Sequence, residues 1–195
     1  MNNEINILLI EIKNSNDSSF EILFKKMHKS VFALAFSILG DKTLAEDVVQ
    51  ETFIRIKTKS NSYLEGTNGV AWIFQIARNL SLNIIKKRKF EVAISKDNQS
   101  LEELFIKHNP SSDKSKEFDR SLEKFLLQEA FTKLNKLERQ IVILYVVSGL
   151  KHKEVAKLLN IPRPTERWYY IRALGKLRKI LSAKTTCERS DLFYE

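Results

Sequence analysis

Apolar residues recur every three or four positions along most of this chain, and the sequence offers few places for a tight turn. Segment 43–56, TLAEDVVQETFIRI, is the clearest example, because one face of the helix that it predicts is apolar and the other is acidic. Thr43 and Glu46 have the spacing of a capping box, which predicts that the helix begins there. The apolar stripe consists of Leu44, Ala45, Val48, Val49, Thr52, Phe53 and Ile56, and the outer face of Glu46, Asp47, Gln50, Glu51 and Arg55.

The segments with this helical periodicity form two groups, which are separated by a polar segment. Since the chain has only five glycines and three prolines, an all-α fold is favoured over a many-stranded β fold. Residues 91–119 are rich in Ser, Asn, Asp and Lys, which is typical of a flexible linker, with at most a short helix at 101–106. We therefore predict two small helical domains, 1–90 and 120–184, joined by this linker and followed by a tail, 185–195. The expected helices are 4–13, 20–39, 43–56, 70–89, 120–135, 137–149, 153–160 and 165–181, with a loop at 60–69.

Two of these helices have apolar stripes that identify their buried sides. The stripe of helix 20–39 consists of Phe20, Phe24, Met27, Val31, Leu34, Ala35 and Ile38, and that of helix 70–89 of Ile73, Ile76, Ala77, Leu80 and Ile84. On helix 70–89, polar side chains share another face, which is expected to point outward. They are Gln75, Arg78, Asn79 and Lys86.

Positive charge gathers in one place in each predicted domain. The formal net charge is +9, from 33 basic and 24 acidic residues. One cluster is the run 86–89, KKRK, and the other lies along 163–179, where six cations accompany a single acid. Each cluster taken alone is compatible with a solvated helix face. Two clusters in separate domains favour a polyanion that is contacted at two points.

The second cluster lies within a helix-turn-helix pattern. In residues 149–178 a short helix, a turn at 161–164 and a long basic helix follow one another, as in folds whose second helix enters the major groove. An αα-hairpin without a DNA role is the alternative. On the long helix Tyr170, Ala173 and Leu177 form the inward stripe, which leaves an outward face. That face consists of Arg167, Trp168, Ile171 and Arg172, although Trp168 can also be read as a packing residue.

Aromatic and amide side chains accompany the first cluster. Tyr63, Trp72 and Phe74 could stack on bases extruded from a duplex, and Asn61 and Asn68 could bond their edges. Asparagines in a loop are also common turn formers, so this pattern is weak without further support.

The sequence offers no constellation for an enzyme. Its three histidines are far apart, no nucleophile motif is present, and we expect no metal site and no cofactor. The single cysteine excludes an internal disulfide and favours a reducing, cytoplasmic compartment. The N-terminus does not read as a signal peptide, and the apolar stretches are too short for membrane insertion.

Three motifs in order, AEDVVQETFIRI, WIFQIARNLSLNIIKKRK and LERQIVILYVVSGLKHKEVAKLLNIP, resemble the extracytoplasmic-function (ECF) class of bacterial RNA polymerase sigma factors over nearly the whole chain. The resemblance implies a non-catalytic protein that binds core RNA polymerase and directs promoter recognition, DNA melting and transcription initiation. Domain 1–90 would recognise and melt the minus-ten element, domain 120–184 would read the minus-thirty-five element, and the linker would run toward the RNA exit path. Core polymerase and promoter DNA are the implied partners. An anti-sigma protein is a further candidate partner, since members of the family are commonly inhibited by one.

The resemblance also implies three groups of site residues. The polymerase's clamp helices would contact Asp47, Gln50 and Glu51. The minus-ten group is Asn61, Tyr63, Asn68, Trp72, Arg78, Asn79, Lys86, Lys87 and Arg88. The minus-thirty-five group is Arg163, Thr165, Arg167, Trp168, Ile171, Arg172 and Lys176.

The chain departs from the family pattern at several positions in the second domain. Asn135 stands where proline is frequent, and Lys151 where a serine-like cap is frequent. Pro164 and Glu166 replace a small residue and a buried valine, and Trp168 replaces a small polar residue. An inward Glu166 would be poorly accommodated in a core. The family's DNA preference is therefore not carried over to this chain.

Two other functions are alternatives. A two-domain helix-turn-helix regulator that is not a polymerase subunit would bind duplex DNA alone and would have no use for the acidic helix. An acid-dependent nuclease would rest only on Glu46, Asp47 and Glu51.

Overall fold

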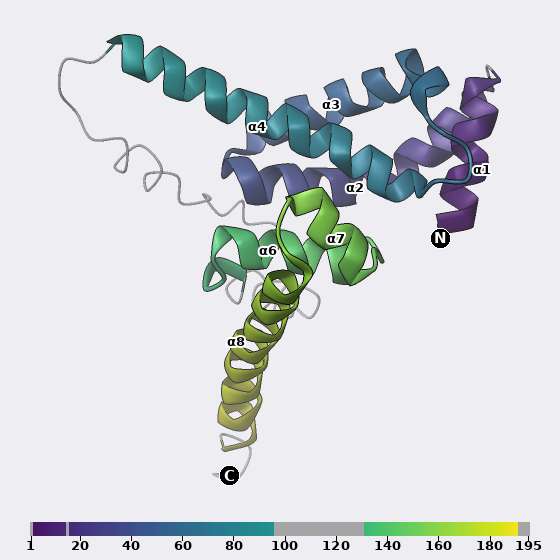
Figure 1. Ribbon diagram of the computed structural model, residues 1–195. Helices are drawn as coiled ribbons and strands as arrows, with labels where there is room; N and C mark the ends of the chain where they lie inside the picture. Colours follow the sequence, from purple (N-terminus) through teal and green to yellow (C-terminus); the bar gives the residue numbers. More distant parts are fainter. Residues whose placement is uncertain (1, 15, 96–130, 191–195) are drawn as a thin grey trace.

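The computed structural model describes residues 2–14, 16–95 and 131–190, and every regular element in these ranges is a helix (Figure 1). The first unit contains α1 (Asn2–Lys13), α2 (Asp17–Leu39), α3 (Lys42–Thr58), the 3-10 turn η1 (Ser60–Ser62) and α4 (Gly69–Ser95). The second unit contains α6 (Lys136–Val142), the π-helical turn η3 (Ile143–Val147), α7 (His152–Leu159) and α8 (Arg163–Ser190). The prediction of an all-α fold with two small helical units is confirmed.

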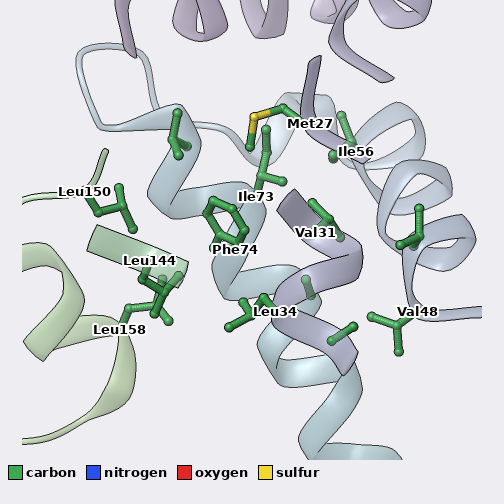
Figure 2. Packing of buried hydrophobic residues seen from close by; sticks show 14 of the residues in the cluster. Met27, Val31, Leu34, Val48, Ile56, Ile73, Phe74, Leu144, Leu150 and Leu158 are labelled. Atoms are coloured by element: carbon green, nitrogen blue, oxygen red, sulfur yellow. The ribbon is translucent and has the colours of Figure 1, made fainter. Parts of the chain in front are cut away.

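Helix α2 lies at the centre of the first unit and packs against α1, α3 and α4. Its inward residues Met27, Val31 and Leu34 are at most 2% exposed. They meet the apolar stripes of α3 and α4 in a single core (Figure 2). Burying a side chain of this size contributes about 1.5–3 kcal/mol. The facing residues labelled in Figure 2 are Val48, Ile56, Ile73 and Phe74.

Side-chain caps set where α2 and α3 begin. The Oδ1 atom of Asn16 accepts hydrogen bonds from the backbone N–H groups of Ser18 and Ser19, so α2 starts at Asp17, three residues before its predicted start. The capping box predicted at Thr43 and Glu46 is wrong. Asp41 Oδ1 accepts from the N–H of Leu44 at 3.1 Å and starts α3 at Lys42. A carboxylate two residues upstream of Thr43 thus takes the place of the threonine as cap.

Two helices extend beyond their predicted ends. Helix α4 continues to Ser95, into the predicted linker, and α8 continues to Ser190, into the predicted tail. No glycine or proline lies between 90 and 95 or between 176 and 190 to stop either helix. The short helix predicted at 101–106, and most of the helix predicted from residue 120, lie outside the described residues.

The second unit packs directly against the first, which the sequence did not predict. Helix α6 and η3 contact α2, and α7 contacts α4. Leu144, Leu150 and Leu158 lie beside Leu34 and Phe74 in one continuous core (Figure 2). A smaller cluster of Leu134, Val142 and Ala173 joins α6 to α8. Helix α8 projects away from the rest of the molecule (Figure 1).

Candidate functional site

The acidic face of α3 is open to solvent, as its sequence pattern predicts. Glu46, Asp47 and Gln50 are exposed, whereas the stripe on the opposite side is buried apart from the half-buried Leu44. The half-buried Glu51 accepts a hydrogen bond from Arg55 Nε at 2.7 Å, one helical turn away. This face therefore offers carboxylates and an amide to a partner, with little positive charge among them.

An open, mainly apolar groove runs beside the acidic face, between α2 and α3. Phe24 was predicted to point into the core but is 39% exposed. Its ring packs against the edge of Phe53 at a centroid distance of 4.8 Å and stacks on His28 at 5.1 Å. A partner that binds this edge of the molecule would thus meet apolar surface next to negative charge. The groove is lined by Phe24, His28, Lys29, Phe32, Glu46, Val49 and Gln50.

Tyr63 belongs to the core of the first unit. Its side chain is 2% exposed, its hydroxyl donates to the carbonyl of Thr67 at 2.9 Å, and its ring packs on Trp72 at 5.5 Å. Burial raises the pKa of the phenol. The predicted stacking of Tyr63 on a base is therefore corrected to a structural role, because the ring fixes the loop and the half-buried Trp72. Phe74 is also fully buried, and Asn61 is exposed.

Gly69 allows the loop to join α4 at a close contact with α1. Its N–H donates to Asn6 Oδ1 at 2.8 Å. A Cβ atom at this position would lie 2.6 Å from the Cδ1 atom of Leu9, closer than carbon atoms approach in folded proteins. The absence of a side chain thus permits this close contact between the start of α4 and α1.

Asn68 and Arg78 are bonded to the second unit. Asn68 Oδ1 caps α4 by accepting from the N–H of Ala71, while Nδ2 donates to Glu154 Oε1 at 2.7 Å. An Nη atom of Arg78 donates to the carbonyl of Leu159 at 3.2 Å. Its Nε is buried without a hydrogen-bond acceptor among the described residues, and burial lowers the pKa of the guanidinium. The outward face predicted for α4 is therefore covered at Arg78.

The last four members of the predicted minus-ten group are exposed along the later turns of α4. Asn79 accepts a hydrogen bond from Gln75 at 2.9 Å and is open to solvent. Lys86, Lys87 and Arg88 are exposed, and Arg88 lies 3.6 Å from Asp41. These side chains form a cationic strip that can follow a phosphate backbone.

The helix-turn-helix has the expected form, with shifted boundaries. Asn160 ends α7 in the left-handed conformation, at φ 57° and ψ 47°. Helix α8 begins at Arg163, two residues before its predicted start, and the N–H of Glu166 bonds the carbonyl of Pro162. Pro164 fits within this first turn because the N–H that it lacks has no intrahelical partner there. Val155, Ala156 and Leu159 are buried.

The predicted outward face of α8 is exposed. Trp168 is 54% exposed and Ile171 is 62% exposed. The ring of Trp168 also packs edge-on against Tyr169 at a centroid distance of 4.9 Å, so it is partly buried as well as outward-facing. Arg172 Cζ lies 5.1 Å from the centroid of the Trp168 ring, within the range of a cation–π contact. Arg163 and Arg167 are exposed and Thr165 is half-buried. The face therefore combines cations with apolar groups.

Glu138 holds two of the cations predicted to contact DNA. Lys176 Nζ donates to Glu138 Oε2 at 2.7 Å, and Arg172 Nε lies 3.3 Å from Oε1. Glu138 is fully buried and shares a capping box with Asn135, which explains the absence of proline there. Burial by itself would raise the pKa of Glu138, but the hydrogen bonds from Lys176 and the Asn135 N–H, with the nearby charges, outweigh it and lower the pKa.

Glu166 is accommodated in the core by a partner that the sequence analysis missed. Glu166 is 0% exposed, and His152 Nδ1 lies 2.9 Å and 3.0 Å from its two oxygens. The imidazole stacks on Tyr145 at 4.1 Å and meets Tyr170 edge-on at 5.0 Å. The expectation that Glu166 is poorly accommodated is thus wrong, because the first residue of α7 supplies a hydrogen-bonding ring. The sequence signal that could have revealed this partner was the histidine at the start of the first helix of the helix-turn-helix.

The described part of the chain offers no other obvious chemistry. No three His, Cys, Asp or Glu side chains in it lie close enough together to hold a metal ion. None of its helices is long and apolar enough to cross a bilayer.

Comparison with known proteins identifies both units. Residues 23–91 match the family Sigma-70 region 2, and residues 124–177 match Sigma-70, region 4. The ECF RNA polymerase sigma factor SigM of Bacillus subtilis is 28% identical over 158 residues, which cover 81% of this chain and 92% of SigM. EcfG of Rhodopseudomonas palustris, another ECF RNA polymerase sigma factor, is 30% identical over 152 residues, which cover 78% of this chain and 79% of EcfG.

Solved structures share the fold. CnrH, in complex with the cytosolic domain of CnrY, superposes with a TM-score of 0.60 at 20% identity, over 92% of this chain and 98% of CnrH. The sigma factor RpoE of Bartonella quintana, in complex with the anti-sigma factor NepR, superposes with a TM-score of 0.59 at 24% identity, over 84% of this chain and 96% of RpoE. The two matched regions and the identity to EcfG show that this chain belongs to the ECF RNA polymerase sigma factors.

Proposed function

We propose that this sigma factor divides its contacts by charge, with polymerase on the acidic face of α3 and promoter DNA on the cationic surfaces of α4 and α8. As a sigma factor it directs promoter recognition and transcription initiation. The observation that carries the division is that exposed carboxylates gather on one face of α3, whereas exposed cations gather on α4 and α8. Glu46 and Asp47 are exposed on α3, whereas Lys86 to Lys89 and Arg163 and Arg167 are exposed on α4 and α8. The regulator that is not a polymerase subunit is not favoured.

For core polymerase, the proposed contact residues are Asp47, Gln50 and Glu51. Their neighbourhood supports this role, because the apolar groove at Phe24 and Phe32 borders the same face. A protein partner needs apolar surface to desolvate, and an exposed phenylalanine provides it. Nucleic acid would be repelled by the carboxylates.

For the minus-ten element, the proposed contacts lie on the loop and on α4. Amide and aromatic groups at the start of α4 would capture unstacked bases, and the cations farther along would hold the strand. Melting then needs no catalytic group, and we propose no catalytic activity and no cofactor for this chain. The proposed group is Asn61, Asn68, Trp72, Arg78, Asn79, Lys86, Lys87 and Arg88, with Tyr63 as their structural support.

For the minus-thirty-five element, α8 would lie in the major groove. Arginine can bond guanine edges or phosphates, and apolar groups such as Trp168 and Ile171 can contact a thymine methyl. Arg172 and Lys176 form ion pairs with Glu138, so they would act at the edge of this surface. The proposed group is Arg163, Thr165, Arg167, Trp168, Ile171, Arg172 and Lys176.

The remaining proposals concern domain limits, partners and location. We assign the first domain to residues 1–90, with the end of α4 projecting beyond it, and the second to 120–184. An anti-sigma protein is a candidate partner, since RpoE, which shares this fold, is bound to the anti-sigma factor NepR. The expected location is the cytoplasm, where a bacterial polymerase works.

Promoter-dependent transcription with purified core polymerase tests the proposed function. Core polymerase with this chain should start specific transcripts on a library of fragments from its own genome, and core polymerase alone should start none of them. A lack of specific transcripts, together with failure of the two proteins to co-purify, would exclude the proposal.

A further inference from the structure

Helix α1 holds the loop 60–69, which carries part of the proposed minus-ten contacts, at two points. Near the tip of the loop, Lys13 Nζ donates to Glu65 Oε1 at 3.2 Å. At the end of the loop, Asn6 Oδ1 accepts a hydrogen bond from the N–H of Gly69 at 2.8 Å. The apolar side of α1 is buried in the core of the first unit, so both contacts start from a fixed helix.

The contact at Gly69 satisfies a backbone group that α4 cannot satisfy itself. The N–H groups in the first turn of a helix have no intrahelical acceptor, and side chains or water must bond them. Gly69 is buried, and Asn6 supplies the acceptor from α1. Without that acceptor a buried donor would be left unsatisfied, which costs free energy. The position of Gly69 therefore depends on Asn6.

The loop is braced internally, so a displacement at its end would shift it without unravelling it. The Tyr63 hydroxyl donates to the carbonyl of Thr67 at 2.9 Å, and the Thr67 hydroxyl donates to the carbonyl of Leu64 at 2.6 Å. Gly66 makes the turn between them at φ 82°. A loop of this kind is placed by its attachments to the rest of the fold.

The side chains proposed to capture bases lie on both sides of Gly69. Asn61 is exposed on the loop, Asn68 directly precedes Gly69, and Trp72 lies one turn into α4. An extruded base is held by stacking together with hydrogen bonds to its edge. Hydrogen bonds tolerate only small changes of distance and angle. The separation of the loop from the first turn of α4 therefore determines whether both kinds of contact form on one base.

We propose that Asn6 is a positioning residue for base capture, which acts through the N–H of Gly69, and that α1 is thus a working part of the minus-ten surface. This inference rests on the proposed minus-ten role of the loop and α4. The matched Sigma-70 region 2 spans residues 23–91 and does not include α1. The ligand is an unpaired base of the promoter. Asn6 would affect how tightly that base is held, and would not affect the contacts of the α4 cations with phosphates.

Four variants isolate the contact. Asn6→Leu keeps a similar shape but removes the acceptor, whereas Asn6→Asp keeps an acceptor oxygen and adds a charge that a helix N-terminus favours. Gly69→Ala breaks the same contact from the other side. Its Cβ atom would lie 2.6 Å from Leu9 Cδ1 and 2.8 Å from Asn6 Oδ1, while alanine itself favours a helix. Asn3→Leu is the matched control, because it makes the same change at an exposed position of α1.

The measurement is the affinity of the holoenzyme for promoter forks, in which the non-template strand of the minus-ten element is single-stranded. The promoter is one identified by the transcription test, and further forks each lack the base of one single-stranded nucleotide. We expect Asn6→Leu and Gly69→Ala to bind the intact fork about tenfold more weakly than the wild type. Asn6→Asp and Asn3→Leu should bind it within about twofold of the wild type.

The forks that lack a base distinguish positioning from a general loss of stability. The fork without the captured base should bind the wild type weakly. Asn6→Leu should bind this fork about as weakly as the wild type does, because the two changes remove the same interaction. A destabilised protein would instead lose affinity equally on every fork. Thermal unfolding followed by circular dichroism shows whether Asn6→Leu is folded, and Gly69→Ala decides the question if it is not.

Two results would overturn the positioning role. One is binding of the intact fork by the folded variants as tightly as by the wild type. The other is an equal loss of affinity on all forks, including the fork without the captured base. If no missing base weakens binding by the wild type, base capture itself is absent and the proposed minus-ten role fails with it. Promoter-dependent transcription tests the sigma factor function separately.

Discussion

His152 and Glu166 face each other across the helix-turn-helix, with the imidazole Nδ1 2.9 Å from a carboxylate oxygen that is closed to solvent. The pair joins the first residue of α7 to the first turn of α8. Since each partner alone would be a polar group in an apolar site, the two residues depend on each other.

The first prediction concerns this dependence. His152→Ala should lower the free energy of unfolding by about 3 kcal/mol, because it leaves the buried Glu166 without its partner. The double variant His152→Phe with Glu166→Val should cost much less, since both polar groups are then replaced by apolar ones. Urea denaturation of the wild type, His152→Phe, Glu166→Val and the double variant completes a double-mutant cycle that measures the coupling, with His152→Ala measured beside it. Additive losses would show that the pair is not a unit.

The second prediction concerns acid stability. The pKa of Glu138 is lowered in the folded chain, so its contribution to stability is complete above the unfolded value, about 4.3, and is lost as the pH falls through the folded value. Glu138→Gln should therefore cost about 2 kcal/mol at pH 7 and less near pH 3, below the unfolded value. Denaturation curves at both pH values test this, with Glu46→Gln, at an exposed site on α3, as control. An equal cost at both pH values would contradict it.

The third prediction concerns polymerase. Reversing Asp47 and Glu51 to lysine should abolish binding to core polymerase, because both carboxylates lie on the proposed docking face, and should leave the helical circular dichroism signal unchanged. Reversing Glu4 and Glu21, which lie on α1 and α2, makes the same charge change and should leave binding intact. Co-purification with core polymerase distinguishes the two pairs. Equal binding by both would remove the docking role from α3.

The fourth prediction separates two kinds of DNA contact on α8. Arg167→Ala should weaken upstream promoter contact and reduce the slope of log affinity against log salt by about 1 if the arginine holds a phosphate. Trp168→Ala should change which base is preferred and leave the salt slope unchanged. Titrations of holoenzyme on promoter variants at several salt concentrations measure both effects. A change of salt slope on loss of the uncharged Trp168 would contradict the assignment.

Helical periodicity was sufficient to predict most of the fold. The stripe of α3 is buried where the pattern placed it, and Trp168 is exposed as the inward stripe of α8 required. These positions follow from local spacing, since a side chain's direction on a helix is fixed by its residue number. Helix starts were harder to predict, because Asp41 and Thr43 can both cap a helix and sequence spacing alone does not show which of them does so.

Contacts between distant segments could not be predicted in this way. Asn68 and Glu154 are 86 residues apart, and the apolar stripe of α7 would look the same in an isolated domain as it does against α4. Tyr63 carries both a ring for stacking and a hydroxyl for an internal bond, and only the fold decides which is used. The pairing of His152 with Glu166 likewise needed the turn between their helices.

Helix α4 runs without a break from Gly69 to Ser95. At a rise of about 1.5 Å per residue, Arg78 and Arg88 are separated by roughly 15 Å along its axis, or about four nucleotides of a B-form strand. A helix of this length does not stretch, so on the proposed function a nucleotide bound at Arg78 and a phosphate bound at Arg88 would keep a constant separation. Inserting one residue between them would turn the cations by about 100° and take them off the strand.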